Sequence, residues 1–227
     1  MMARRRGAAI GDLLVEPGGA SGAGAVEPLA DGACVLRGFG AAEAAALVAA
    51  IHDIVARAPL RRMVTPGGFT MSVAMTNCGQ AGWITDRRGY RYAASDPLSG
   101  QAWPPLPAVF DGLATRAAAA AGFAGFVADA CLINRYEPGT RLTLHQDRNE
   151  RDFAAPIVSV SLGLPVTVLF GGLKRAERPR RIALESGDVA VWGGPSRLVF
   201  HGVDPLADGE HPLTGRCRFN LTLRKAL

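Results

Sequence analysis

The sequence lacks features that mark several protein classes. No run of about eighteen uncharged apolar residues occurs, which argues against a membrane-spanning helix. The apolar run after residues 4–6 is too short and too interrupted for a signal peptide. No Cys-x-x-Cys pair occurs, which argues against a thiolate zinc site or a thioredoxin-type redox centre. We therefore expect a cytoplasmic protein that keeps its four cysteines reduced: Cys34, Cys78, Cys131 and Cys217.

The chain does contain enough apolar material for one sizeable domain. Hydrophobic residues make up 48% of its 227 residues and charged residues 20%, which excludes wholesale disorder. The net charge of +5 permits a phosphate-bearing partner without requiring one. The first thirty residues are rich in Gly, Ala and Pro. We expect a flexible tail over residues 1–30 and one domain over residues 31–227, ordered from near Ala33.

Two helical patterns precede a series of short strands. Apolar spacing predicts helices over residues 41–58 and 107–121. β-branched and aromatic runs between Gly, Pro and Asp predict strands at 34–36, 131–136, 157–162, 166–170, 182–184, 188–192, 198–201 and 219–223. No long helix separates the later strands, so a parallel sheet is not expected. The sequence predicts an α+β fold, a double-sheet jelly roll (double-stranded β-helix) with N-terminal helices.

The segment 59–106 differs from the rest of the chain. Gly and Pro interrupt it repeatedly, and aromatic side chains and arginines lie between them. Such a turn-rich stretch is typical of recognition loops. Short hairpins whose aromatic side chains pack inward are the alternative.

Polar residues alternate along the last predicted strand. Because alternate strand residues share a face, Arg218, Asn220, Thr222 and Arg224 lie on one face. This face points either to solvent or into the mouth of the barrel. Two inward arginines would need anionic partners, and a small dicarboxylate supplies two.

A second alternating segment carries a candidate metal site. His145 and Asp147 would project to the same side of an extended chain, and His201 is the best candidate for a third ligand. Two histidines and one carboxylate on one face leave coordination positions open, which suits ferrous iron that binds a co-substrate and oxygen.

Several stretches together carry a family resemblance. They are residues 63–68, 71–79, 129–136, 144–147, 155–165 and 218–222. In these motifs the chain resembles the AlkB family of iron(II)/2-oxoglutarate-dependent nucleic-acid dealkylases, closest to its bacterial DNA-repair branch, from about Asp31 to Lys225.

The resemblance implies an activity and a set of site residues. The activity is oxidative demethylation of bases such as 1-methyladenine or 3-methylcytosine in DNA, which releases formaldehyde, succinate and CO2. The base must be single-stranded or flipped out of a duplex. The implied Fe(2+) ligands are His145, Asp147 and His201. The implied 2-oxoglutarate residues are Asn134, Tyr136, Arg218, Asn220 and Arg224. The implied substrate residues are Thr65, Met75, Trp83, Tyr90, Arg91, Tyr92, Asn149 and Arg175, several of them in a nucleotide-recognition lid over residues 59–106.

One position departs from the family pattern. The family usually has an acid two residues after the metal aspartate, thought to read the exocyclic amine of the base, and this chain has Asn149. We therefore expect a relative gain on bases with a carbonyl there, such as 1-methylguanine, unless Asn149 faces solvent. Alternatives to a DNA dealkylase are a related oxygenase acting on RNA or a small molecule, or a non-catalytic jelly-roll binding module. We expect a monomer without a membrane partner.

Overall fold

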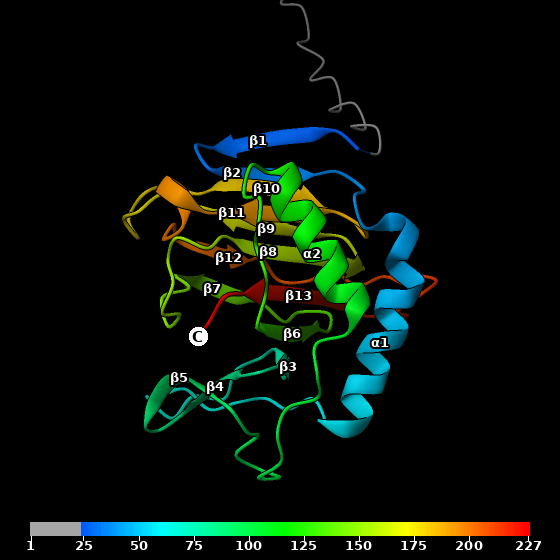
Figure 1. The fold of residues 1–227 in the computed structure, drawn as a ribbon, viewed down its shortest axis with the longest axis vertical. Coiled ribbons are helices and arrows are strands. Elements are labelled where there is room, and N and C mark those ends of the chain that lie inside the picture. The colour runs from blue at the N-terminus through cyan, green and yellow to red at the C-terminus, as the bar shows by residue number, and fades with distance from the viewer. Residues whose placement is uncertain (1–23) are drawn as a thin grey trace, which may run out of the picture.

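Two antiparallel sheets form the core of the computed structural model, which describes residues 24–227 (Figure 1). The larger sheet has seven strands, in the spatial order β1 (Val26–Ala30), β2 (Ala33–Leu36), β11 (Val189–Trp192), β8 (Ile157–Gly163), β13 (Arg218–Arg224), β6 (Ala130–Tyr136) and β3 (Ala74–Gly79). The smaller sheet has four, in the order β10 (Arg180–Leu184), β9 (Val166–Phe170), β12 (His201–Val203) and β7 (Leu142–His145). These paired sheets agree with the predicted jelly-roll core.

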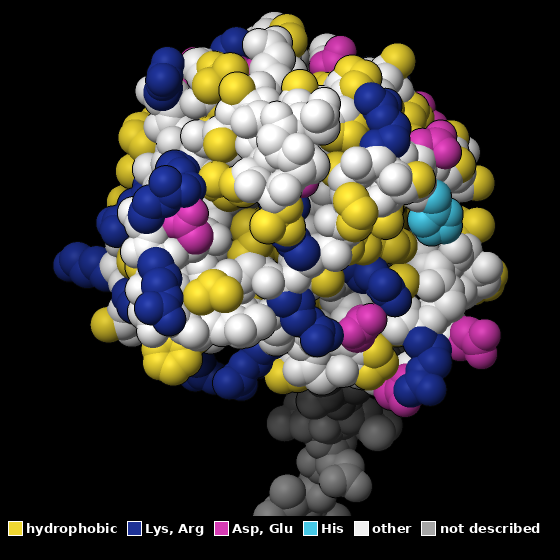
Figure 2. Space-filling model, turned by 90° about the horizontal axis from the view of Figure 1, so that it is seen from below, with side chains coloured by type: hydrophobic (Ala, Val, Ile, Leu, Met, Phe, Trp, Pro, Cys, Tyr) yellow, Lys and Arg dark blue, Asp and Glu magenta, His cyan; other side chains and the backbone are white. Residues whose placement is uncertain are grey.

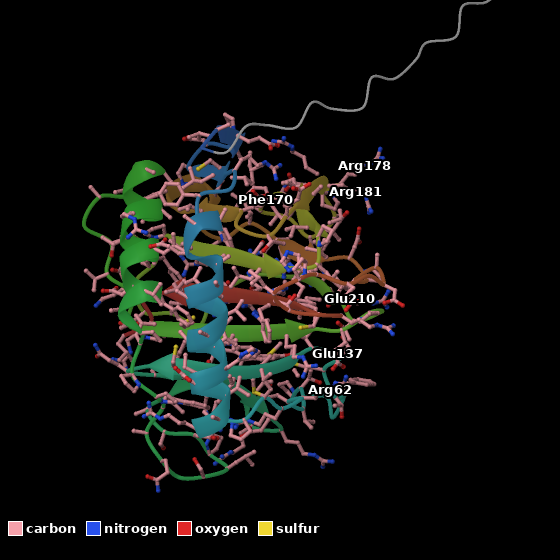
Figure 3. All side chains as sticks on the ribbon, turned by 90° about the vertical axis from the view of Figure 1, so that its right-hand side faces the viewer. Arg62, Glu137, Phe170, Arg178, Arg181 and Glu210 are labelled. Atoms are coloured by element: carbon pink, nitrogen blue, oxygen red, sulfur yellow. The ribbon has the colours of Figure 1, made fainter. Side chains whose placement is uncertain are left out.

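The two sheets pack face to face through apolar side chains. Ile157 and Trp192 of the larger sheet share one buried cluster with Phe170, Ile182 and Leu184 of the smaller sheet. Figure 3 shows Phe170 within this layer. A second buried cluster joins Leu132 and Tyr136 of the larger sheet to Val166 of the smaller sheet, and the cavity described below also lies between the sheets.

Two helices cover the outer face of the larger sheet (Figure 1). Helix α1 (Ala44–Arg57) follows a short 3-10 turn (Ala41–Glu43) and buries the stripe that its spacing predicts, Leu47, Val48, Ile51 and Ile54. Helix α2 (Ala108–Ala120) begins after Pro107 and precedes Gly122, whose φ of +91° suits a helix end. A second 3-10 turn (Gly194–Ser196) precedes β12. None of the helices within residues 24–227 has the length and apolar character needed to cross a membrane.

The alternation of β13 gives the larger sheet two different faces. Phe219, Leu221 and Leu223 pack into the helix-covered core. The polar residues between them line the cavity on the opposite face. The polar row therefore points inward, and the solvent-facing alternative is excluded.

The structure corrects two boundaries. Order begins before Ala33, because Val26–Ala30 forms β1 and pairs with β2; the rest of the predicted tail, residues 1–23, lies outside the described residues. The strand predicted at 198–201 is instead β12, which starts at His201. The Gly194–Ser196 turn, a further turn at residues 197–198 and two residues outside any strand occupy the preceding positions. All four cysteines are buried and free, as expected.

The segment 59–106 turns some of its aromatic side chains inward, as the hairpin alternative expects, and others toward the cavity. It contains edge strand β3 and the hairpin of β4 (Gly82–Asp86) and β5 (Gly89–Ala93), which lies below β3 in Figure 1. Ile84 and Trp103 pack inward, whereas Trp83 and Tyr90 border the cavity. The segment is joined to the body by the pairing of β3 with β6, and the exposed ion pair of Arg62 with Glu137 at 2.9 Å adds a contact (Figure 3). Figure 2 shows basic side chains outnumbering acidic ones over the lower face.

Candidate active site

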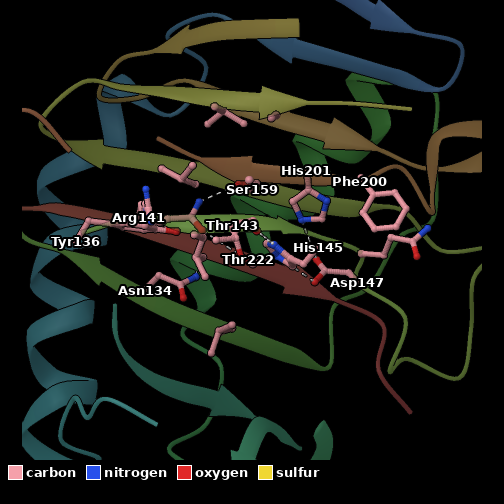
Figure 4. A pocket seen from close by; sticks show the side chains of 18 of the residues that line it. Asn134, Tyr136, Arg141, Thr143, His145, Asp147, Ser159, Phe200, His201 and Thr222 are labelled. Atoms are coloured by element: carbon pink, nitrogen blue, oxygen red, sulfur yellow. Dashed lines mark hydrogen bonds and ion pairs between the residues drawn. The ribbon is translucent and has the colours of Figure 1, made fainter. Parts of the chain in front are cut away.

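A cavity of about 1060 Å³ opens between the two sheets and the segment 59–106. Its walls are the polar faces of β13 and β6, the strands β7 and β12, and the loops before and after β7. Figure 4 shows its polar side chains. The volume is at the upper end of the range for ligand-binding clefts.

His145, Asp147 and His201 meet at one end of this cavity. Their candidate ligand atoms all lie within 4.8 Å of one another. His145 ends β7 and His201 begins β12, and the two residues are directly paired across these strands. Gly202 permits this approach, since a Cβ there would lie 2.8 Å from the Leu142 carbonyl oxygen. The predicted triad is therefore brought together by the pairing of two strands that are distant in sequence.

Backbone carbonyls orient both imidazole rings. His145 Nδ1 donates to the Thr143 carbonyl at 2.9 Å, and His201 Nδ1 donates to the Val199 carbonyl at 3.2 Å. The Nε2 atoms lie 4.0 Å and 3.7 Å from the two carboxylate oxygens of Asp147. Because a carbonyl only accepts, Nδ1 carries the proton and Nε2 keeps its lone pair for a cation.

The electrostatic surroundings keep two of these groups in their metal-binding protonation states. Burial favours a higher pKa for Asp147, but Arg224 and the two imidazoles outweigh it and hold this pKa well below its usual range. Burial, together with His145, lowers the pKa of His201 to about 4. At neutral pH the site therefore offers a carboxylate and a neutral imidazole.

The far end of the polar row contains a buried cation. Arg218 is 1% exposed, donates from Nη2 to Ser161 Oγ at 3.0 Å, and lies 5.2 Å from the centre of the Tyr136 ring. Its Nε and Nη1 atoms have no hydrogen-bond partner within residues 24–227. Burial lowers the pKa of this guanidinium. A buried cation without an anionic partner is costly. The arrangement is therefore suited to binding an anion such as a carboxylate, whose oxygens accept hydrogen bonds from the guanidinium.

The other predicted co-substrate residues lie between the two ends. Asn134 Nδ2 donates to Asn220 Oδ1 at 3.2 Å, across the paired strands β6 and β13. Asn134 Oδ1 has no partner among the described residues. Arg224 donates from Nε and Nη2 to Asp147 Oδ2 at 3.2 Å and 2.7 Å, which places it at the metal end. All five predicted residues border or contact this cavity.

Six of the eight predicted substrate residues line the cavity. Trp83 stacks on Tyr90 with ring centres 5.7 Å apart, and Trp83 Nε1 donates to Asn149 Oδ1 at 3.1 Å. Asn149 is exposed to solvent, as the alternative expects, and this hydrogen bond ties its side chain to the rim of the cavity. The six are Thr65, Met75, Trp83, Tyr90, Asn149 and Arg175.

The other two predicted substrate residues make internal contacts. Arg91 binds the carboxylate of Asp86, with distances of 3.0 Å and 2.7 Å. The hydroxyl of Tyr92 donates to Glu150 Oε1 at 2.7 Å. Neither residue lines the cavity in the described structure.

Sequence reasoning missed several polar residues of the site. Ser159 and Ser161 of β8 bind Asn220 and Arg218, respectively. Their alternation within an apolar strand is the same signal that identified the polar row of β13, and it would have found them. Glu150 carries no such signal, because its partners come from other elements.

Comparisons with known proteins agree with this geometry. Residues 32–224 match the family model described as the 2OG-Fe(II) oxygenase superfamily. The chain is 58% identical to the "Alpha-ketoglutarate-dependent dioxygenase AlkB" of Escherichia coli, over 88% of this chain and 93% of that protein. It is 43% identical to the AlkB homolog of Caulobacter vibrioides, over 80% and 81% of the two chains.

A solved structure shows the same fold. "The structure of OsALKBH1" matches with a TM-score of 0.78 and 28% identity, covering 88% of this chain and all of that one. The family uses Fe(2+) and 2-oxoglutarate, and His145, Asp147 and His201 have the ligand set that such iron sites need. The chain therefore belongs to the AlkB family of 2OG-Fe(II) oxygenases.

Proposed function

We propose that this dioxygenase removes methyl groups oxidatively from pairing-edge nitrogens of bases in DNA, as direct-reversal repair. The observation that carries the proposal is the composition of one cavity. It holds a two-histidine, one-carboxylate cluster, an unpaired buried arginine and a stacked Trp83–Tyr90 pair at its rim. The 58% identity to a dioxygenase named AlkB supports the same activity.

The residues present fit the two groups that the family requires. His145, Asp147 and His201 would hold Fe(2+) through Nε2 atoms and a carboxylate oxygen. Arg218 would hold the distal carboxylate of 2-oxoglutarate through its free Nε and Nη1 atoms. When bound, iron would use O2 and the electrons of 2-oxoglutarate, which becomes succinate and CO2, to hydroxylate a methyl carbon, and the N-hydroxymethyl product would then release formaldehyde.

The polar residues of β6 and β13 would orient the co-substrate. Asn134 offers an oxygen without a described partner, and Tyr136 stands opposite Arg218 in the strand register. Asn220 is held by Ser159 at 2.8 Å and by Asn134. Fixed side chains of this kind position a reactant without reorganising when it binds.

The segment 59–106 would act as the nucleotide-recognition lid. It supplies Thr65, Phe69, Met75, Trp83 and Tyr90 to the cavity wall. A flipped base needs an aromatic face to replace the stacking that it loses, and Trp83 offers one. Arg148 and Arg175 border the same cavity and would attract the phosphate backbone.

Asn149 would shift the preference among methylated bases. Trp83 engages its Oδ1 atom, so the group that Asn149 can offer a base is the Nδ2 donor. A donor suits a base carbonyl better than an exocyclic amine. We expect Asn149→Asp to lower the ratio of 1-methylguanine to 1-methyladenine repair, measured on matched oligonucleotides. An unchanged ratio would contradict this role.

The test of the function is turnover of a panel of methylated oligonucleotides. Formaldehyde and succinate are measured with 1-methyladenine and 3-methylcytosine in DNA and in RNA of the same sequence. We expect both products in equal amounts with methylated DNA, dependent on added Fe(2+). Asp147→Ala and the unmethylated oligonucleotide serve as controls. Succinate without formaldehyde on every member of the panel would refute the proposal, and RNA turnover alone would move the substrate class to RNA.

A further inference from the structure

Beyond the candidate ligands, one buried acid lies close to the metal end of the cavity. Glu150 follows Asp147 on the same loop, and its side chain is only 1% exposed. None of the roles described above uses it. Burying a charged carboxylate costs folding free energy unless cations and hydrogen-bond donors surround it. The partners of Glu150 therefore indicate its role.

Glu150 connects three separate elements. Its Oε1 atom accepts from the Tyr92 hydroxyl of β5 at 2.7 Å and lies 3.4 Å from Arg224 Nε of β13. Its Oε2 atom accepts from Arg197 Nη2 at 3.2 Å. Arg197, which is 3% exposed, also donates to the Asp147 backbone carbonyl at 2.8 Å.

Two of the residues that contact Glu150 also bind the candidate ligand Asp147. Arg224 binds Asp147 Oδ2, and Arg197 binds the Asp147 carbonyl, while Glu150 lies between the two guanidinium groups. Two buried cations thus face the buried carboxylate of Glu150 and the partly buried carboxylate of Asp147. Without the charge of Glu150, Asp147 would be the carboxylate left to Arg224 among the described residues, and Arg224 would compete more strongly with a metal ion for it.

The same acid also reaches the lid. Tyr92 lies on the strand that carries Tyr90, and Tyr90 stacks on Trp83 at the cavity rim. One carboxylate therefore joins the hairpin β4–β5 to the loop that carries Asp147. We propose that Glu150 is a positioning residue that fixes Asp147 for metal binding and couples it to the lid. The proposal rests on the proposed function for the identity of the metal and substrate.

The first test measures metal binding without turnover. Mn(2+) is titrated into the 2-oxoglutarate-loaded protein, and free Mn(2+) is followed by its electron paramagnetic resonance signal. We expect Glu150→Gln to weaken Mn(2+) binding about tenfold, as loss of an outer-shell partner does. Glu43→Gln is the matched control, because Glu43 pairs with Arg116 at 2.7 Å on the far side of the fold. We expect that variant to bind Mn(2+) like the parent.

The second test isolates the link to the lid. Tyr92→Phe removes one hydroxyl, which also accepts from Arg224 Nη1 at 3.3 Å, but it keeps the ring and the 2.7 Å ion pair of Arg224 with Asp147. Mn(2+) affinity should therefore stay within about twofold. The Kd for a methylated oligonucleotide, measured by fluorescence anisotropy on the Mn(2+)-loaded protein, should rise about fivefold.

The two tests overturn the proposal in distinct ways. If the Glu150→Gln variant binds Mn(2+) as tightly as the parent, Glu150 does not position Asp147 for metal binding. Tyr92→Phe with unchanged oligonucleotide affinity removes the link to the lid, so the proposed coupling can still be overturned if Glu150→Gln does not fold. A purely structural role would lower the thermal unfolding midpoint without changing either affinity. Since Mn(2+) binding requires no turnover, failure of the proposed demethylation leaves the first test valid.

Discussion

Arg218 and Arg224 stand on the same face of one strand, and their surroundings are opposite. Both are buried, at 1% and 4% exposure. Arg224 faces Asp147, Glu150 and Tyr92, which outweigh burial and raise the pKa of its guanidinium. Arg218 faces one serine and one aromatic ring, and burial lowers the pKa of its guanidinium. The first arginine is neutralised by the fold, whereas the second is left for a ligand to neutralise.

The comparison teaches how to separate a structural charge from a binding charge. Removing a structural charge should cost stability in the free protein. Removing a binding charge should cost ligand affinity and leave the free protein unharmed. The following predictions test this separation, in order of decreasing effect.

Arg224→Met should have the largest effect on the free protein. It leaves the carboxylates of Asp147 and Glu150 without this cation, which typically costs about 3–5 kcal/mol. The free energy of unfolding is measured by urea denaturation, with exposed Arg88→Met as the control. If the free energy of unfolding fell by less than about 1 kcal/mol, Arg224 would not be a structural charge, and the two arginines would not differ in this way.

Arg218→Met should reverse that pattern. We expect the Kd for 2-oxoglutarate to rise at least about thirtyfold, equal to about 2 kcal/mol. The free energy of unfolding without co-substrate should stay the same or increase, because an unpaired buried cation is removed. Isothermal titration and urea denaturation of one preparation measure both quantities. Lower stability with unchanged affinity would assign Arg218 to the fold instead.

Arg218→Lys should have an intermediate effect on co-substrate binding. Lysine keeps the charge and loses the planar fork that binds a carboxylate through two nitrogens. We expect the Kd for 2-oxoglutarate to rise about tenfold. Equal affinity of the lysine variant and the parent would show that charge alone is recognised.

Ser161→Ala should have the smallest effect. It removes the side-chain acceptor that residues 24–227 provide for Arg218, a hydrogen bond of 3.0 Å, and leaves the charge in place. We expect the Kd for 2-oxoglutarate to rise about fivefold, corresponding to about 1 kcal/mol. Ser159→Ala, which affects Asn220 instead, is the matched comparison. A larger effect for Ser159→Ala would place the co-substrate nearer Asn220.

The sequence predicts much of this site because the site lies on regular strands. β13 pairs with β6 on one side and β8 on the other, so strict alternation divides its residues between the cavity and the helix-covered core. The same rule places Asn134 and Tyr136 on one face. Apolar spacing and the flanking prolines likewise give α1 and α2 to within a few residues.

What could not be predicted depends on contacts between distant segments. The orientation of Tyr92 is set by Glu150, which lies far along the chain and has no local pattern. β1 forms because its backbone pairs with β2, although its own composition resembles a tail. β12 starts only at His201, although residues 198–200 alone would favour a strand, because a turn at 197–198 continues the Gly194–Ser196 turn and Leu198 to Phe200 stay outside the sheets.

The carbonyls of Thr143 and Val199 have a further consequence, because each holds an imidazole from within its own chain segment. The ligand rings are therefore oriented by the backbone and do not depend on the ion for their direction. A chelator should be able to empty the site, and added ferrous salt should refill it, without a refolding step in between. Iron supply and exchange, more than assembly of the protein, would then govern how much enzyme is active.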